Sequence, residues 1–252
     1  MIGVSCTEFC SKPVDYWAPE IAKDFRLWEI FSEADHSVYR DTQHILEVLD
    51  ANDLACQVHA PICDWNLAAM SDRLREASVK ETIAAIEAAE ELGARMVTVH
   101  PGLSSMAVGG LEERAAERAK AALRVIDKHV AGRDLKVAIE NMPDIPFFLG
   151  RTAEQLNGLV DGTDLGICFD IGHANTAGQI DAMIDTFGDR IVNIHIHDNH
   201  GKRDEHLTLG DGEIDFEHVV GKLSGYRGNW IIESKTLESA VQSSSRLEKL
   251  IS

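Results

Sequence analysis

The stretch SDRLREASVKETIAAIEAAEELGARMVTVH, residues 71–100, contains one complete repeat of the expected fold. Its first part places Ala, Leu and Ile at spacings of three and four residues and ends at Gly93, which predicts an amphipathic helix with a glycine stop. The run MVTV that follows is nearly continuous in apolar character, as is typical of a parallel strand covered on both faces. The unit closes on His100, a polar residue at the predicted end of a strand.

Short β-rich runs alternate with helical patterns along the whole chain, and a second clear helix is predicted in LEERAAERAKAALRVIDKHVAG, residues 111–132. Eight strands are predicted, near Ile2–Ser5, Arg26–Ile30, Leu54–His59, Arg95–His100, Lys136–Glu140, Asp164–Asp170, Ile191–His197 and Asn229–Glu233. An open, doubly wound sheet would normally carry a glycine-rich nucleotide loop, which is not found. The pattern predicts an α/β fold, a single-domain (β/α)8 TIM barrel over residues 1–252, close to the roughly 250 residues typical of that fold.

Composition narrows the functional classes. The chain is 44% hydrophobic and 26% charged, as in ordinary globular proteins, and its 24 basic and 42 acidic residues give a net charge of −18. Such a surplus of acids disfavours a general nucleic-acid platform. Five cysteines without a C-x-x-C pair indicate a reducing, cytoplasmic setting, and no apolar run is long enough to predict export or a membrane span. The sequence does not specify an oligomeric state.

Potential metal ligands recur where the predicted strands end. The candidates are His59 in QVHAP, His100 in VTVHPG, Glu140 in VAIENMP, Asp170 in ICFDIGH, His195 in VNIHIHD and Glu233 in WIIESK; three more, His173, Asp204 and His206, lie in the following loops. In a parallel barrel these strand ends meet on one face, where barrel enzymes place their active sites. We therefore expect residues far apart in sequence to converge.

A simpler interpretation exists for each of these residues alone. A single histidine at a strand end is more often a hydrogen-bonded polar residue than a ligand, and a carboxylate such as Asp170 can cap the next helix. Independent capping does not predict His, His, Glu, Asp, His and Glu on successive strands. Buried carboxylates would repel one another and become protonated, whereas a divalent cation allows them to stay ionised beside neutral imidazoles. The joint pattern predicts a metal site.

The same motifs resemble a known superfamily. They are His-Pro-Gly after strand four, Glu-Asn after strand five, Asp-Ile-Gly-His after strand six, His-Ile-His-Asp after strand seven, the run DEHLTLGDGEID at residues 204–215, and Ile-Glu-Ser at strand eight. Together they resemble the xylose-isomerase-like TIM barrel superfamily over nearly the whole chain. That superfamily includes sugar and sugar-phosphate isomerases and epimerases, and also endonuclease IV, of AP endonuclease family 2.

The resemblance implies one to three divalent ions, Zn²⁺ or Mn²⁺. Similarity to endonuclease IV implies three zinc ions, held by His59, His100 and Glu140, by Glu140, Asp170, His195 and Glu233, and by His173, Asp204 and His206. Similarity to the isomerases and epimerases implies one ion, on Glu140, Asp170, His195 and Glu233. His197 lies on the same side of the strand as His195, and His195 is selected as the ligand because the family motif places it three residues before Asp198.

Two reactions are compatible with these ligands. The first is isomerisation or epimerisation of a small sugar, sugar phosphate or polyol through an enediol, with Glu140 and Glu233 as general base and acid. The predicted substrate-binding residues are Glu29, Asn141, Arg203 and Lys235, although the two cations have solvated loop charge as an equally good explanation. The second is hydrolysis of a phosphate ester at abasic sites in DNA by a three-metal cluster.

Departures from endonuclease IV favour the first reaction. The chain begins IGVSCTEFC where that enzyme has a Gly-Ala-His-Val-Ser type of strand, and HAPICDW after strand three shows no DNA-penetrating Arg, Tyr or Leu. Phosphate contacts normally need Lys and Arg, which the acidic balance opposes. A small-molecule partner is therefore predicted, and DNA only under the alternative. Five histidines without a pattern are expected at the surface, namely His36, His44, His129, His200 and His218.

Overall fold

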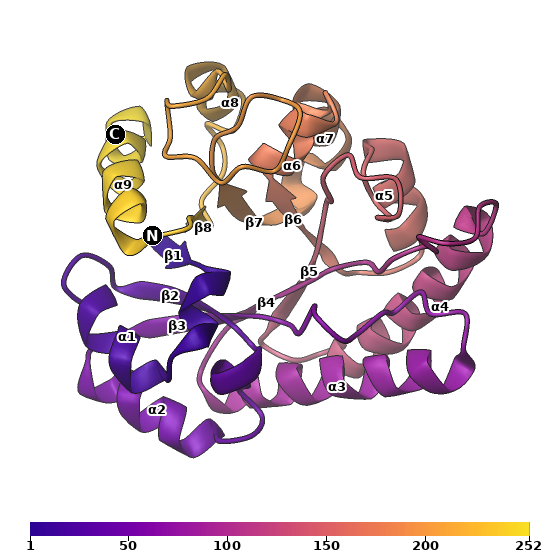
Figure 1. Cartoon of the computed structure of the whole chain (residues 1–252), viewed down its shortest axis with the longest axis horizontal. Coiled ribbons are helices and arrows are strands. Elements are labelled where there is room, and N and C mark those ends of the chain that lie inside the picture. Colours follow the sequence, from indigo (N-terminus) through magenta and orange to yellow (C-terminus); the bar gives the residue numbers. More distant parts are fainter. Residues whose placement is uncertain (252) are drawn as a thin grey trace.

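Eight parallel strands pair in sequence order and close into a barrel in the computed structural model, which describes residues 1–251 (Figure 1). The strands are β1 (Ile2–Ser5), β2 (Leu27–Phe31), β3 (Ala55–His59), β4 (Met96–Val99), β5 (Lys136–Glu140), β6 (Gly166–Asp170), β7 (Ile191–Ile196) and β8 (Asn229–Glu233). The α-helices are α1 (Val14–Ile21), α2 (Thr42–Ala51), α3 (Asp72–Glu91), α4 (Glu112–Val130), α5 (Ala153–Val160), α6 (Ile171–Thr176), α7 (Ile180–Phe187), α8 (Phe216–Lys222) and α9 (Leu237–Ile251). Short 3₁₀ turns occupy Thr7–Ser11, Ala34–His36 and Gly188–Arg190. The predicted (β/α)8 barrel is confirmed.

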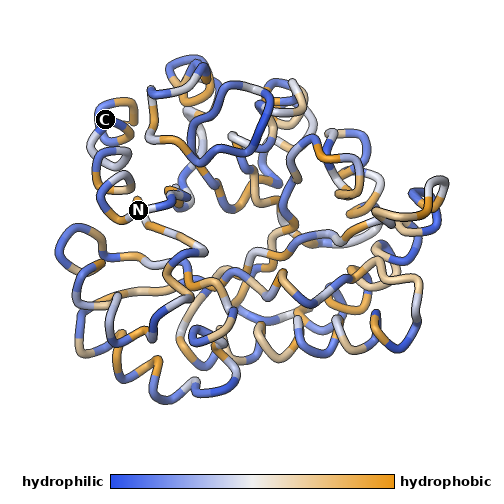
Figure 2. The backbone as a smooth tube through the Cα atoms, in the orientation of Figure 1, coloured by the Kyte–Doolittle hydropathy of each residue, from blue (hydrophilic) through white to orange (hydrophobic). Residues whose placement is uncertain are grey.

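The hydrophobic core lies between the strands and the surrounding helices. In β6 the outward residues Ile167 and Phe169 are fully buried in this core, while Cys168 and Asp170 alternate with them and face the barrel interior. Figure 2 shows the same division, because orange segments follow the strands whereas blue and orange alternate along the helices. The inward-facing positions of the strands can therefore carry polar side chains, and the candidate site is built from them.

The two long helices follow the sequence pattern closely. On α4 the buried residues Ala115, Ala119, Ala122 and Ile126 recur at three- and four-residue spacing and form the stripe that packs on the barrel. Gly93 follows α3 with φ of 74°, the left-handed conformation in which glycine ends a helix at little cost. The predicted strand boundaries differ from the observed ones by one or two residues.

Two sequence expectations meet different outcomes. His36 was expected at the surface, but it is buried, with Nε2 2.7 Å from the carbonyl oxygen of Lys12 and its ring edge-on to Trp28. The prediction for His36 is wrong, because this histidine pairs a ring nitrogen with a backbone carbonyl and packs its ring against an aromatic side chain, and so can be buried. Within residues 1–251, no helix has the length and apolar character needed to cross a membrane.

Candidate metal centre

Acidic residues from three strand ends meet around one imidazole. Glu140, Asp170 and Glu233 are the last residues of β5, β6 and β8, and all are buried. Nδ1 of His195 lies 3.2 Å from Oε1 of Glu140, 3.0 Å from Oε1 of Glu233 and 3.9 Å from Oδ2 of Asp170. The four residues to which the resemblance assigns one ion therefore lie close together around the ring of His195.

Glu140 also faces two further histidines, His59 and His100. Its Oε2 atom lies 3.1 Å from Nε2 of His59 and 3.0 Å from Nε2 of His100, while Oε1 faces His195. The ring of His59 is fixed by a contact of 2.9 Å between Nδ1 and the carbonyl oxygen of Ala60 and by stacking on Phe31. Nδ1 of His59 therefore donates to the backbone, which leaves its Nε2 lone pair available to a cation beside Glu140.

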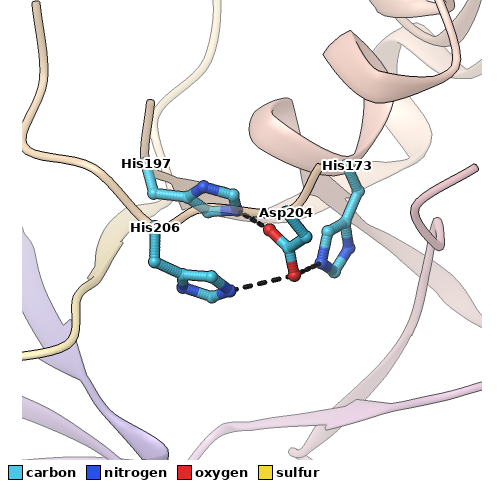
Figure 3. Close-up of side chains that lie close together, drawn as sticks. All are labelled: His173, His197, Asp204 and His206. Atoms are coloured by element: carbon cyan, nitrogen blue, oxygen red, sulfur yellow. Dashed lines mark hydrogen bonds and ion pairs between the residues drawn. The ribbon is translucent and has the colours of Figure 1, made fainter. Parts of the chain in front are cut away.

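A third group, which we call the β7 loop cluster, consists of His173, His197, Asp204 and His206 (Figure 3). Oδ2 of Asp204 lies 3.2 Å from Nε2 of His173 and 3.0 Å from Nε2 of His206, and Oδ1 lies 3.4 Å from Nε2 of His197. The sequence interpretation selected His195 and omitted His197. The two-residue spacing on one strand was the available signal, because it places both rings on the same side.

The loop after β7 is held in place by Asp198. Its Oδ2 accepts hydrogen bonds from the backbone N–H groups of Gly210 (2.8 Å) and Gly212 (2.9 Å). A Cβ added at Gly212 would overlap the Asp198 carboxylate, so glycine is required there. His206 adopts a positive φ of 48°, which is strained for a residue other than glycine. These constraints position Asp204 and His206 over the barrel.

Asp170 combines capping with a free oxygen. Oδ1 accepts a hydrogen bond of 2.6 Å from the N–H of His173, so the carboxylate does cap α6. Oδ2 is buried and makes no hydrogen bond within the described chain, and it faces the cluster around His195. Asn141 was predicted to contact substrate, but its side chain is fully buried and pairs with the backbone N–H and carbonyl of Asp170, both at 2.8 Å. Its observed role is to hold Asp170.

Glu29 lies one layer below the candidate metal ligands. It occupies the middle of β2, is fully buried, and has Oε1 2.8 Å from Nε2 of His195. Its other oxygen accepts hydrogen bonds from Gln57 (2.5 Å), Asn193 (3.2 Å) and Thr98 (3.3 Å). The predicted substrate contact is not compatible with this depth. Glu29 instead supports His195 from inside the barrel.

A cavity of about 360 Å³ opens above these groups, within the range of roughly 300–1,000 Å³ typical of small-molecule sites. It is lined by Ser5, Cys6, Thr7, Glu8, Phe31, His59, Ile62, His100, Glu140, Met142, Pro143, Ile145, Phe148, His173, Asp204, His206, Glu233, Ser234 and Lys235. Lys235 reaches the cavity, as predicted for a substrate-binding residue, and it supplies the one Lys or Arg among these lining residues. Arg203 is exposed and lies outside the lining.

Residues 19–250 match the family model described as xylose isomerase-like TIM barrel. The chain belongs to this family. An uncharacterized protein of Methanocaldococcus jannaschii is 35% identical over 259 residues, covering 99% of this chain and 88% of that protein. The crystal structure of a D-tagatose 3-epimerase-like protein superposes with a TM-score of 0.90 at 34% identity, covering 99% of this chain and 96% of the other.

Another relative carries a different activity in its name. A probable endonuclease 4 of Thermoplasma volcanium is 28% identical over 235 residues, which is 83% of this chain and 80% of that protein. Proteins similar to this xylose isomerase-like barrel thus carry the names of both sugar epimerases and endonucleases. The resemblance inferred from the motifs is confirmed at the level of the family.

Neighbouring charges shift the pKa values of the buried carboxylates and imidazoles of this site toward their ionised forms. Burial alone raises the pKa of Glu140, but the imidazoles of His195 and His100 outweigh it and hold that pKa well below its usual value. Burial likewise lowers the pKa of His173, yet Asp170, Asp204 and Glu140 hold it well above the usual value for an imidazole. The pKa values of His195 and His197 are raised as well, whereas burial lowers that of His100, so protonation is favoured at the rings of His173, His195 and His197 beside the buried carboxylates and not at His100.

The donor atoms match a divalent cation. Asp170 Oδ2, Asp204 Oδ1 and both ring nitrogens of His197 are buried and lack hydrogen-bond partners within residues 1–251. Each such orphan costs about 1–3 kcal/mol unless something compensates it. Imidazole nitrogens and carboxylate oxygens without thiolates suit Zn²⁺ or Mn²⁺, which would satisfy these atoms and replace the protons.

Proposed function

We propose that this protein is a divalent-metal-dependent isomerase or epimerase of a small sugar, sugar phosphate or related polyol. The observation that carries the proposal is that Glu140 and Glu233 both line one cavity of about 360 Å³ and both approach the same nitrogen of His195. A cavity of that size suits a monosaccharide. We assign one Zn²⁺ or Mn²⁺ ion to Glu140, Asp170, His195 and Glu233, because the first three form one candidate metal group and Glu233 contacts the ring of His195.

The chemistry would be proton transfer through an enediol. The bound cation would polarise adjacent carbonyl and hydroxyl oxygens of the sugar and so acidify the C–H bond between them. One of the two carboxylates, Glu140 or Glu233, removes that proton, and the C–H electron pair moves toward the carbonyl to form the enediol. The other carboxyl group returns a proton to the same carbon or its neighbour, which inverts a centre or moves the carbonyl.

The rest of the cavity lining contains both polar and apolar residues. Lys235, Ser5 and Thr7 can bind hydroxyl or phosphate oxygens of the substrate. Phe31, Met142 and other apolar lining residues help to exclude water from the reacting atoms. A similar structure is described as a D-tagatose 3-epimerase-like protein, which supports ketohexoses as the first substrates to test.

A second candidate function is a three-metal hydrolase acting at abasic sites in DNA. It is favoured by the convergence of His59 and His100 on Glu140 and of His173 and His206 on Asp204, since one ion does not need these ligands. The name of the Thermoplasma relative points the same way. A cavity in which Lys235 is the one Lys or Arg among the lining residues, in a chain of net charge −18, gives a DNA backbone little to bind. We therefore rank this function second.

Incubation in D₂O provides a sharp test. Purified protein loaded with Mn²⁺ or Zn²⁺ is mixed with D-tagatose, D-fructose or their phosphates, and solvent deuterium at the epimerised or isomerised carbon is followed by NMR. We expect deuterium incorporation and product formation, both abolished by chelator and by Glu140→Gln or Glu233→Gln. Arg227→Ala is the matched control, because Arg227 is exposed, precedes β8 and lies outside the cavity lining.

The opposing result is equally concrete. Cleavage of an abasic-site oligonucleotide by the same preparation, lost on chelation and without deuterium exchange into any sugar, would reverse the ranking of the two functions.

The five free cysteines are typical of a reducing environment. We therefore propose a reducing compartment such as the cytoplasm for this reaction.

A further inference from the structure

His197 is the member of the β7 loop cluster that neither the sequence motif nor the assigned ions explain. One donor atom from each of His173, His197, Asp204 and His206 lies within 4.8 Å of the others. His173, Asp204 and His206 line the cavity, whereas His197 is fully buried and approaches Asp204 from behind them. Figure 3 shows the four side chains converging from separate segments on one small volume.

The ring of His197 is enclosed by other residues, yet its nitrogens make no hydrogen bond within residues 1–251. Both ring nitrogens lack a hydrogen-bond partner within the described chain, although Nε2 lies 3.3 Å from Oδ1 of Asp170 and 3.4 Å from Oδ1 of Asp204. The ring stacks on His206, with centroids 4.1 Å apart and planes inclined by 5°. On its other side, a Cβ at Gly172 would overlap the ring, so glycine in α6 creates the space for it.

The resemblance to endonuclease IV already implies an ion on His173, Asp204 and His206; we propose that in this chain His197 is a fourth protein ligand of that ion and closes its coordination sphere. Three histidines and one carboxylate form a complete tetrahedral set for Zn²⁺. Sites with three protein ligands keep a position open for water or substrate, whereas sites with four are structural. Occupancy would satisfy Nε2 of His197 and Oδ1 of Asp204 together.

This ion has a different task from the one assigned to Glu140 and Glu233. It links α6, through His173, and the end of β7, through His197, to the loop that carries Asp204 and His206, and thereby fixes one wall of the cavity. With four protein ligands it has no position for an attacking hydroxide or a phosphate oxygen. The inference does not rest on sugar chemistry, since it concerns ligation alone.

Cobalt substitution tests the coordination directly. The protein is loaded with Co²⁺ in a background carrying His59→Ala, His195→Ala and Glu233→Ala, which removes a member from each of the other candidate metal groups of the described residues and leaves the β7 loop cluster intact. We expect one bound ion with the intense visible absorption of tetrahedral Co²⁺, unchanged on addition of azide because no position is open. His197→Ala should weaken Co²⁺ binding at least about tenfold, or leave a weaker absorption that azide alters.

Two further variants keep the test decisive. His200→Ala removes an exposed histidine of the same loop and should leave the spectrum unchanged. Gly172→Ala crowds the His197 ring without removing a donor and should reproduce the effect of His197→Ala, with far-UV circular dichroism confirming that each variant is folded. The proposal is overturned if the cluster binds no cobalt, if azide perturbs the parent spectrum, or if a folded His197→Ala protein retains both affinity and spectrum. None of these readouts requires sugar turnover, so they stand apart from the proposed function.

Discussion

Replacing Glu29 by Gln should weaken the metal centre without touching any of its assigned ligands. Glu29 Oε1 lies 2.8 Å from Nε2 of His195, and Nδ1 of the same ring faces Glu140 and Glu233. A carboxylate at that distance keeps the proton on Nε2 and leaves Nδ1 as a neutral donor for the cation. Glu29→Gln removes the charge while the shape of the side chain is retained.

The expected magnitude follows from the environment of Glu29. Glu29 Oε1 contacts His195 as an ion pair and makes no hydrogen bond within residues 1–251, so the substitution removes a charge contact to the ligand ring and not a hydrogen bond. The amide also presents an NH₂ group to Gln57 and Asn193, which donate to Glu29 in the native protein. Removing partners of this kind typically costs about 10–100-fold in metal affinity, and we expect a value in that range.

The assay is competition for Zn²⁺ against a chromophoric chelator at fixed pH and ionic strength. Thr98→Val serves as the control, because Thr98 contacts the other oxygen of Glu29 at 3.3 Å and does not touch His195. The reasoning predicts a large loss for Glu29→Gln and a small one for Thr98→Val, with thermal melts in chelator comparing the two metal-free proteins. Equal losses would assign the effect to general disruption of the barrel interior, and no loss would refute the support of His195.

Three other outcomes are expected. Metal affinity should weaken as pH falls, by about tenfold per pH unit for each proton displaced, because the raised pKa of His173 lets protons compete for its ring; calorimetry in buffers of different ionisation enthalpy should detect proton release, and its absence would contradict this. Gly212→Ala should destabilise the protein by about 1–3 kcal/mol, since the new Cβ overlaps Asp198, and should speed proteolysis of the loop after β7; an unchanged urea midpoint would oppose it. Phe169→Ala should cost about 3–5 kcal/mol in urea unfolding, because Phe169 is fully buried outside the barrel, and a cost near zero would contradict the assigned core face.

The part of the site that was predictable from sequence is the part fixed by strand ends. Glu140, Asp170 and Glu233 each terminate a strand, and a closed parallel barrel brings all such ends to one face whatever the side chains are. Their convergence therefore needed only the order of the elements and the alternation of strand residues. The family match supports the barrel fold over residues 19–250.

Depth within the barrel was harder to predict from sequence. Glu29 lies two residues before the end of β2, so its carboxylate lies a layer below the ligands, and counting from the strand end would have revealed this. Three successive inward positions of β7 and its extension belong to different layers. Asn193 contacts Glu29, His195 contacts Glu140, and His197 contacts Asp204. A strand boundary uncertain by one residue hides which layer each side chain joins. His197 was set aside for a different reason, because the family motif places the ligand three residues before Asp198, at His195.

The ligands and the reaction are therefore determined by different parts of the chain. Every ligand position compatible with a one-ion isomerase is also compatible with a three-ion hydrolase, so the identity of Glu140 or His195 cannot separate the two. The walls of the cavity can, because DNA requires an extended basic surface whereas a monosaccharide requires a small volume with one apolar side. Here the volume is about 360 Å³ and Lys235 is the one Lys or Arg of the described lining. The proposed closure by His197 would add a second constraint, because an ion with four protein ligands has no position for a nucleophile, and both constraints would favour chemistry at Glu140 and Glu233.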